Sequence, residues 1–245
     1  MMQRRQFSLG LMAATTMPLW GCAATSNAAN RDKTTREWNE TLASIERTAQ
    51  GRMGVAMLDT GSGLQLGWRQ DERFAMASTF KAVLAGWMLE RVDRGQESLA
   101  QRVRYERDAL VPYSPVTEKH VGAGGITVAE LCEATVTLSD NTAANLLLAR
   151  HGGPEGFTGF ARSLGDAVTR LDRTEPTLNE ALPGDPRDTT TPVAMLHSLR
   201  TLVLGQALSP ASRAQLTEWI VNNKTGDKRL RAGVPIGGGH VLHLV

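Results

Sequence analysis

A long, strongly apolar helix is the feature that most constrains how this chain can fold. From Ser78 onward, large apolar side chains recur at the i, i+3, i+4, i+7 and i+8 positions: Phe80, Val83, Leu84, Trp87 and Met88. Side chains at this spacing share one face of an α-helix, which is stable only when other elements cover it. The pattern predicts a buried, central helix that ends near Gly95, with the core assembled around it.

Two short strands are predicted before this helix. Residues 54–58 and 63–68 are strand-like and flank Asp59-Thr60-Gly61-Ser62, a sequence typical of a hairpin turn. A further helix is predicted over residues 34–48. A sheet therefore begins in the N-terminal part of the chain.

Later helices are marked by residues that cap helix N-termini. Thr127 followed by Glu130 is a capping box. Thr191-Pro192 and Ser209-Pro210 each place a hydroxyl before a proline, which favours two more helices. Shorter helices are predicted at 143–150 and 156–164.

The first 29 residues have the three parts of an export signal. Arg4 and Arg5 form a charged start, residues 7–20 are apolar, and small residues follow. The apolar part is too short for a membrane-spanning helix. The arginine pair resembles a twin-arginine signal, and Cys22 stands where a lipoprotein box carries its acylated cysteine. We expect export to the periplasm, with removal of the leader or a lipid anchor at Cys22 as alternatives.

Composition limits what the remaining segment, residues 30–245, can do. The chain has 245 residues, 41% of them hydrophobic, enough for one large domain or two closely packed lobes. Of its 27 basic residues, Arg4 and Arg5 lie in the leader, so 25 remain against 25 acidic ones, which argues against a nucleic-acid partner. Cys132 then has no cysteine to pair with, so an internal disulfide is excluded and a buried thiol is expected. We expect a monomer.

The predicted central helix begins with a serine and a lysine three residues apart. In Ser78-Thr79-Phe80-Lys81 the hydroxyl and the amine lie one above the other on a helix face. Ser78 lies at the helix end where the dipole favours negative charge, which suits a nucleophile with its base. For such a pair alone, a capping serine beside a surface lysine is the commoner explanation.

Two further groups of polar residues accompany this pair. Ser139-Asp140-Asn141 lies between two predicted helices, where a helix-capping turn is the simpler interpretation. Glu175 and Asn179 lie in the loop 166–190 and offer a carboxylate and a carboxamide that could share one water; a solvated surface loop is the simpler interpretation. Loops of this length inside a compact domain are usually functional.

Together, and in this order, the three groups resemble the SxxK, SDN and ExxLN motifs of the class A serine β-lactamases. Further segments that look like this family are 110–115, 125–130, 152–154, 162–192 and 230–235. The resemblance covers roughly residues 35–235. It implies an α+β fold of the β-lactamase/transpeptidase type, with a helical lobe at about 77–205, an α/β lobe built from both chain ends, and the catalytic groups at their junction.

The resemblance implies a catalytic role for five of these residues. Ser78 would be the nucleophile that becomes the acyl-enzyme. Lys81 would help to take its proton; whether Lys81 or Glu175 acting through a water is the base of acylation stays open. Ser139 would pass a proton to the lactam nitrogen, and Glu175 with Asn179 would activate the water that releases the acyl group.

It also implies binding and structural roles. Asn141 would hold the amide of the substrate's side chain, and Tyr113 would stack at the rim of the cleft. Arg173 and Asp188 would close the loop by an ion pair, and the Glu175-Pro176 bond would be cis. No metal or cofactor is expected, since the five histidines show no HxH or HExxH spacing.

The family also has a Lys-Thr-Gly on a strand that lines the cleft, where the lysine attracts the substrate carboxylate and a main-chain N–H completes the oxyanion hole. Residues 223–226, Asn-Lys-Thr-Gly, have these letters but follow a predicted helix and precede the segment LRAGVP. We therefore interpret them as a turn in which Gly226 caps the helix and Lys224 points into solvent. No further Lys-Thr-Gly follows, so we expect a truncated or frame-shifted chain whose sheet lacks its C-terminal strands.

The sequence thus predicts an enzyme that hydrolyses β-lactams through an acyl-serine, impaired in this chain by the missing strand. A D-alanyl-D-alanine carboxypeptidase or transpeptidase is the alternative enzyme, because it shares SxxK. Such an enzyme does not need a deacylating carboxylate, so the presence of Glu175 with Asn179 argues against this alternative. A non-catalytic remnant is the alternative outside the enzymes.

Overall fold

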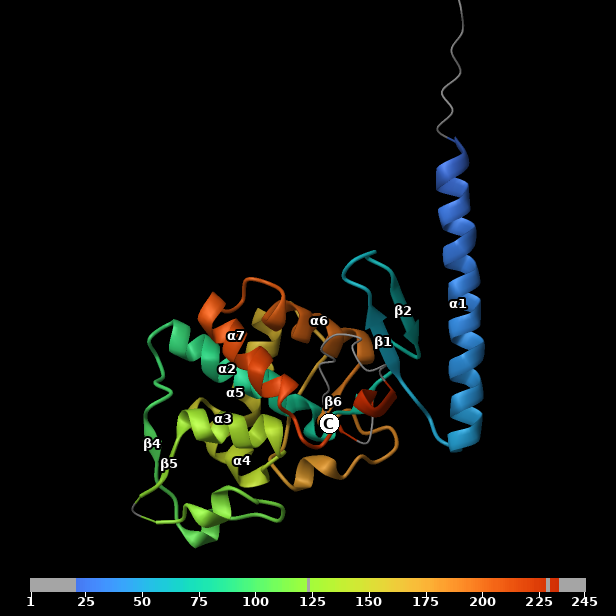
Figure 1. The fold of residues 1–245 in the computed structure, drawn as a ribbon. Coiled ribbons are helices and arrows are strands. Elements are labelled where there is room, and N and C mark those ends of the chain that lie inside the picture. Colours follow the sequence, from blue (N-terminus) through green and yellow to red (C-terminus); the bar gives the residue numbers. More distant parts are fainter. Residues whose placement is uncertain (1–20, 123, 228–229, 234–245) are drawn as a thin grey trace, which may run out of the picture. The chain divides into compact units, whose positions relative to one another are not determined.

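The chain divides into two compact units, Met1–Gly51 and Arg52–Val245. Figure 1 shows the computed structural model, which describes residues 21–122, 124–227 and 230–233. The described part of the first unit is mainly the helix α1 (Gly21–Ala49). It starts earlier than the predicted helix 34–48, because residues 21–29, which we assigned to the leader, are rich in alanine, the strongest helix former.

The leader is only partly covered by the described residues. Arg4 and Arg5 lie outside them, and so does the apolar stretch 7–20. A search of the described helices found none with the length and apolar character needed to cross a membrane.

The second unit opens with the predicted hairpin. Strands β1 (Val55–Leu58) and β2 (Gln65–Trp68) pair antiparallel, with Val55 opposite Trp68. Among the described strands β1 pairs with β2 alone, so the α/β lobe contains a two-stranded sheet where the family resemblance implies a larger one.

The hairpin turn is held by its own side chains. The Asp59 carboxylate accepts hydrogen bonds from Gly61 N at 2.9 Å and from Ser62 Oγ at 2.5 Å. Gly63 has φ +71°, a left-handed conformation that glycine adopts without steric cost. The Asp-Thr-Gly-Ser signal therefore predicted the turn correctly.

Two further pairs of short strands connect distant parts of the chain. β3 (Phe74–Ala75) pairs with β6 (Thr189–Thr190), and β4 (Arg102–Val103) pairs with β5 (Ile126–Thr127). The first pair joins the end of the loop 166–190 to the segment just before Ser78. The loop is thereby attached next to the predicted nucleophile.

Helix α2 (Phe80–Asp93) is the centre of the core, as its periodicity predicted (Figure 1). Every residue from Phe80 to Glu90 is buried, so the helix is covered on all sides and not along one stripe only. Phe80 packs edge-on against Phe157, and Trp87 stacks on Phe160, with ring centroids 5.8 Å and 5.9 Å apart. Each such aromatic pair adds about 0.5–1.5 kcal/mol beyond the burial of its surface.

Five helices surround α2: α3 (Val128–Thr137), α4 (Asn141–Arg150), α5 (Gly153–Ser163), α6 (Pro192–Val203) and α7 (Pro210–Val221). Short 3-10 turns occupy Ala77–Thr79, Arg107–Ala109, Thr117–Lys119, Thr177–Asn179 and Leu230–Gly233. The N-terminal caps are those predicted. Thr127 and Glu130 form a reciprocal capping box, and the Thr191 and Ser209 side chains accept from Ala194 N and Ser212 N.

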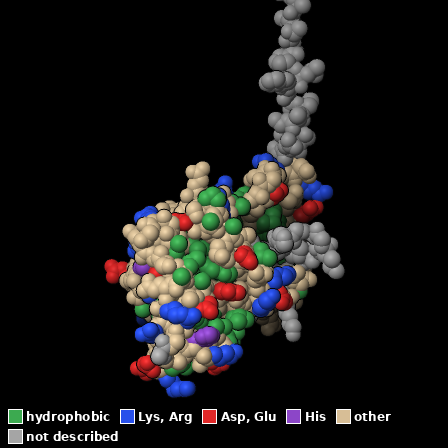
Figure 2. All heavy atoms as spheres, turned by 60° about the vertical axis from the view of Figure 1, so that its left-hand side comes forward, with side chains coloured by type: hydrophobic (Ala, Val, Ile, Leu, Met, Phe, Trp, Pro, Cys, Tyr) green, Lys and Arg blue, Asp and Glu red, His purple; other side chains and the backbone are tan. Residues whose placement is uncertain are grey.

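The two lobes meet at α6, which contacts β1 on one side and α2 on the other. In the described residues the fold is thus α+β, with a helical lobe packed around α2 and a small sheet, as expected. The thiol of Cys132 is buried inside the helical lobe, and this burial raises its pKa. On the face shown in Figure 2, positive and negative side chains are interspersed, which is consistent with the near-neutral balance of charges.

Candidate functional site

Ser78 lies in the 3-10 turn Ala77–Thr79, directly before α2, and is half-buried. Ala77 has φ +43°, an uncommon conformation for a residue with a side chain. Met76 N donates to Asp188 O at 2.9 Å, which fixes the segment before the turn. The predicted helix therefore begins two residues after Ser78, and the serine is held by a tight turn ahead of it.

Lys81 lies in the first turn of α2 with only 2% of its surface exposed. Its Nζ donates to Ser139 O at 2.9 Å, to Ser139 Oγ at 3.1 Å and to Asn141 Oδ1 at 2.6 Å. A buried ammonium needs such partners, because an unpaired charge in the interior is very costly. The predicted surface-lysine alternative is therefore wrong: Lys81 is a buried, fully engaged amine.

Ser139 connects Ser78, the predicted nucleophile, to Lys81. It lies between α3 and α4 with φ +60°, and its Oγ donates to Ser78 Oγ at 2.8 Å. The hydroxyls and the amine thus form a continuous path, Ser78 Oγ to Ser139 Oγ to Lys81 Nζ. A non-glycine residue in this conformation is strained, which is typical of residues held for function.

The two residues after Ser139 have different roles. Asp140 is fully buried and caps α4 through Ala143 N, as the simpler interpretation predicted, and it also accepts hydrogen bonds from Val116 N and Thr117 N at 2.9 Å. Asn141 Oδ1 accepts from Lys81, and its Nδ2 donates to Pro112 O at 2.8 Å.

Tyr113 is at the rim of the site. Its side chain is 61% exposed, its φ is +64°, and its carbonyl accepts from Asn141 N at 3.0 Å. The ring therefore projects from a segment attached to α4, which agrees with the predicted position at the edge of a cleft.

Glu175 lies on the other side of Lys81, only 3% exposed. Its Oε1 is 3.0 Å from Lys81 Nζ, and its Oε2 accepts from Asn179 Nδ2 at 2.6 Å. Among the residues that the structure describes, Oε1 contacts the Lys81 ammonium and has no further hydrogen-bond donor. A buried carboxylate oxygen with spare acceptor capacity can hold a water.

Sequence reasoning missed Asn145, which fixes Glu175. Asn145 Oδ1 accepts from Glu175 N, and its Nδ2 donates to Glu175 O, both at 2.9 Å. Asn145 lies one helical turn after Asn141 on α4, so this spacing was the signal that could have found it.

Burial is the largest influence on Lys81. It lowers the pKa of Lys81 from the ordinary 10.5, because the charged form is poorly solvated there. The Glu175 carboxylate opposes this, since it attracts the ammonium and forms an ion pair with it. A lysine with a lowered pKa can act as a proton acceptor more readily than an exposed one.

The loop that carries Glu175 is closed by the predicted ion pair. Arg173 Nε lies 2.6 Å from Asp188 Oδ2, and the buried Asp188 also accepts from Asp172 N and Arg173 N. The Glu175-Pro176 bond is cis, as the resemblance implied. Arg173 and Asp188 therefore act on the loop and lie outside the reactive cluster.

The segment 223–226 is a turn, as predicted, but the prediction that Gly226 caps the helix is wrong. Helix α7 ends at Val221 with Asn222 as its C-cap, and Gly226 lies four residues later. The reason is that Asn223, not glycine, closes the turn: its Oδ1 accepts from Thr225 N and Gly226 N. Lys224 is exposed, as expected, and it is among the residues that line the same hollow as Ser78.

This hollow has a volume of about 510 Å³. It is lined by five predicted site residues, Ser78, Tyr113, Ser139, Asn141 and Asn179, and by Leu138, Lys224 and Thr225. Its volume lies within the usual range for small-molecule sites. The predicted nucleophile Ser78, its hydrogen-bond partner Ser139 and a polar rim therefore meet in one ligand-sized space.

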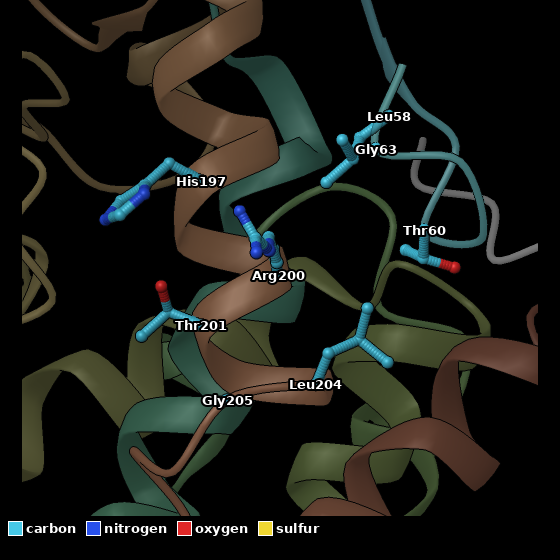
Figure 3. A pocket seen from close by; sticks show the side chains of 8 residues that line it. All are labelled: Leu58, Thr60, Gly63, His197, Arg200, Thr201, Leu204 and Gly205. Atoms are coloured by element: carbon cyan, nitrogen blue, oxygen red, sulfur yellow. The ribbon is translucent and has the colours of Figure 1, made fainter. Parts of the chain in front are cut away.

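A second hollow, of about 480 Å³, lies between the hairpin and α6 (Figure 3). Leu58 and Thr60 come from the hairpin side, and Arg200 and Leu204 from the helix side. None of the predicted site residues lines it, and it holds no serine or cysteine next to a base. Within the described ranges, no group of three or more His, Cys, Asp or Glu side chains could hold a metal ion.

Comparison with known proteins gives matches along most of the chain. The family model described as the beta-lactamase enzyme family matches residues 37–244, which extends past residue 235, where the motif resemblance ended. The β-lactamase FAR-1 of Nocardia farcinica is 54% identical over 196 residues, which are 80% of this chain and 62% of that protein. The chain thus spans less than two thirds of the length of this curated relative.

Solved structures resemble this one closely. The ancestral (GNCA) class A β-lactamase has a TM-score of 0.79 and 66% identity, over 80% of this chain and 75% of that chain. The putative class A β-lactamase PenP from Rhodopseudomonas palustris has a TM-score of 0.79 and 63% identity, over 81% and 76% of the two chains.

Proposed function

The chain belongs to the beta-lactamase enzyme family, with class A β-lactamases among its relatives, and from this premise we propose that it opens the cyclic amide of β-lactams through an acyl-serine. The observation that carries the proposal is the path of short contacts from Ser78 Oγ through Ser139 Oγ to Lys81 Nζ, with Glu175 beside it.

Acylation uses the nucleophile and this path. Ser78 Oγ attacks the lactam carbonyl carbon and gives up its proton, the carbon–nitrogen bond breaks, and the ring nitrogen receives a proton from Ser139 Oγ. Lys81 is placed to restore the Ser139 proton at 3.1 Å. The proton of Ser78 goes either to Lys81 or, through a water, to Glu175.

Deacylation uses the other side of Lys81. Glu175 Oε1 has spare acceptor capacity, and Asn179 holds Oε2. A water bound to Oε1 gives its proton to Glu175 and attacks the ester carbonyl, which releases the ring-opened product and regenerates Ser78. This arrangement favours hydrolysis over the carboxypeptidase or transpeptidase alternative, which does not require a deacylating carboxylate.

The test is turnover of a chromogenic cephalosporin by the purified chain, beside intact-mass analysis after benzylpenicillin. We expect a covalent adduct on Ser78 and none in Ser78→Ala. Absence of both adduct and turnover in a folded parent protein would support the non-catalytic alternative. Slow hydrolysis of β-lactams by this chain stays a prediction, and the turnover of the chromogenic cephalosporin measures it.

We further infer that the protein is exported to the periplasm and acts as a monomer. The charged, apolar and small-residue parts of residues 1–29 support export, and lipidation at Cys22 is the alternative to cleavage. Cell fractionation with mass analysis of the mature N-terminus distinguishes the two. Scattering or sedimentation of the purified protein measures its oligomeric state.

A further inference from the structure

The hollow between the hairpin and α6 is separate from the site around Ser78. None of the residues that line the Ser78 hollow lines this one. Leu58 points from the hairpin toward α6, where Arg200 and Leu204 lie on the side nearer the hairpin (Figure 3). The volume of about 480 Å³ is within the usual range for small-molecule sites. The walls of this hollow therefore determine what it can bind, independently of the proposed chemistry at Ser78.

Arg200 provides a positive charge in this hollow. It is exposed, and its guanidinium has no ion-pair or hydrogen-bond partner among the residues that the structure describes. The described residues that line the hollow include no Asp or Glu. His197 also lines it, but its Nε2 donates to Leu164 O at 2.9 Å, so that ring nitrogen is already engaged. Arg200 is therefore the group that is open to an anion.

The nearest elements do not supply an anion for Arg200. Asp59 lies in the hairpin turn, but it does not line the hollow, and its carboxylate accepts hydrogen bonds from Gly61 and other groups of its own turn. On the helix side, the guanidinium of Arg213 donates to Gly205 O, and Gly205 lines the hollow. A second positive charge thus lies near the edge of the hollow, which further favours an anionic ligand.

A larger hollow elsewhere in the fold shows the contrast. It has a volume of about 680 Å³ and lies beside residues 181–186. Its basic and acidic side chains are already paired: Arg52 lies 2.7 Å from Glu72, and Asp185 lies 2.6 Å from Arg187. Size alone therefore does not distinguish the hollow beside α6, whereas its unpaired guanidinium does.

The other walls of the hollow beside α6 suit the apolar part of a ligand. Leu58 lines it from β1, and Leu204, with 62% of its surface exposed, lines it from the end of α6. Thr60 and Thr201 supply hydroxyls, which can donate to an anionic oxygen. A guanidinium binds a carboxylate through two parallel hydrogen bonds. We propose that this hollow is a second ligand site, which binds a small aliphatic carboxylate with its anionic end on Arg200 and its chain on the two leucines.

The test uses hexanoate and its uncharged counterpart 1-hexanol as probes. Both are titrated into the purified chain, and binding is followed by the NMR shifts of main-chain amides, which should change at Thr60 and Thr201. Arg200→Ala should weaken binding of hexanoate about two- to fivefold, the range of an exposed ion pair, and leave binding of 1-hexanol unchanged. The loss for hexanoate should shrink in 1 M salt, where charges are screened within about 3 Å.

Four further variants separate charge, apolar contact and the site around Ser78. Arg200→Lys should recover part of the lost affinity for hexanoate, and Leu204→Ser should weaken binding of both probes. Arg107→Ala removes an exposed arginine that does not line the hollow and should have no effect. Ser78→Ala should bind both probes as the parent does, because the inference does not depend on β-lactam hydrolysis.

Four results would overturn the inference. These are no binding of hexanoate by the folded parent chain, equal affinity for hexanoate with and without Arg200, an equal loss for hexanoate and 1-hexanol in Arg200→Ala, and amide shifts confined to the residues around Ser78.

Discussion

Replacing Asn145 should uncouple Glu175 from the rest of the site. The Asn145 amide makes two hydrogen bonds to the main chain of Glu175, each 2.9 Å long, and Glu175 is 3% exposed. A neutral hydrogen bond contributes about 1 kcal/mol net, so Asn145→Ala should lower the free energy of unfolding by about 2 kcal/mol. For a unit of this size that corresponds to a fall in Tm of about 4–8 °C.

The same change should affect chemistry more than stability. Glu175 Oε1 lies 3.0 Å from Lys81 Nζ only while its main chain is held in place. A displacement of about 1 Å can lower a rate a hundredfold. Deacylation should therefore slow, and intact-mass analysis should show an adduct on Ser78 that persists in Asn145→Ala but decays in the parent.

Asn222→Ala is the matched control, because Asn222 is exposed and uses only its main chain at the end of α7. It should change stability by no more than about 0.5 kcal/mol and leave the adduct lifetime unchanged. Equal stabilities of the two variants, or equal adduct lifetimes in Asn145→Ala and the parent, would refute the reasoning.

Three other substitutions test the site. Glu175→Ala should leave acylation at least partly active and stall deacylation, so that mass spectrometry shows an adduct accumulating on Ser78; unchanged turnover would remove Glu175 from the mechanism. Asp188→Ala breaks a buried ion pair and should cost about 3–5 kcal/mol in chemical denaturation. Asp185→Ala, which breaks a pair with the exposed Arg187, should cost clearly less, and similar losses would contradict this account of the loop. The pKa of Lys81 is lowered in the folded protein, so between that pKa and 10.5 the unfolded chain binds more protons than the folded one. The free energy of unfolding should therefore rise with pH through this window, relative to Lys81→Met, when denaturation is measured at several pH values. Parallel pH curves for the two proteins would argue against the shift.

The family and most helix starts could be predicted from the residues. Thr127 with Glu130, Thr191 and Ser209 each cap the helix that they were expected to open, and the Asp59 turn closes its hairpin. These features are local: each bond joins residues two or three positions apart, so the order of residue types suffices to define it. The early start of α1 was missed because its alanine-rich beginning also fits the small-residue end of a leader.

Only the tertiary structure decided how the polar residues meet. Ser139 Oγ lies between Ser78 Oγ and Lys81 Nζ. The SxxK spacing of Ser78 and Lys81 does not show that a third residue, about 60 positions later, connects them. The same holds for Asn145, whose partner Glu175 is 30 positions away. Such contacts depend on how helices pack around α2, and packing is a property of the whole core, which no short motif contains. The turn 223–226 shows the physical reason most clearly. Its sequence predicts a turn, but only the hydrogen bond from the buried Asn223 to Val136 in α3 shows that this turn lies beside the hollow of Ser78.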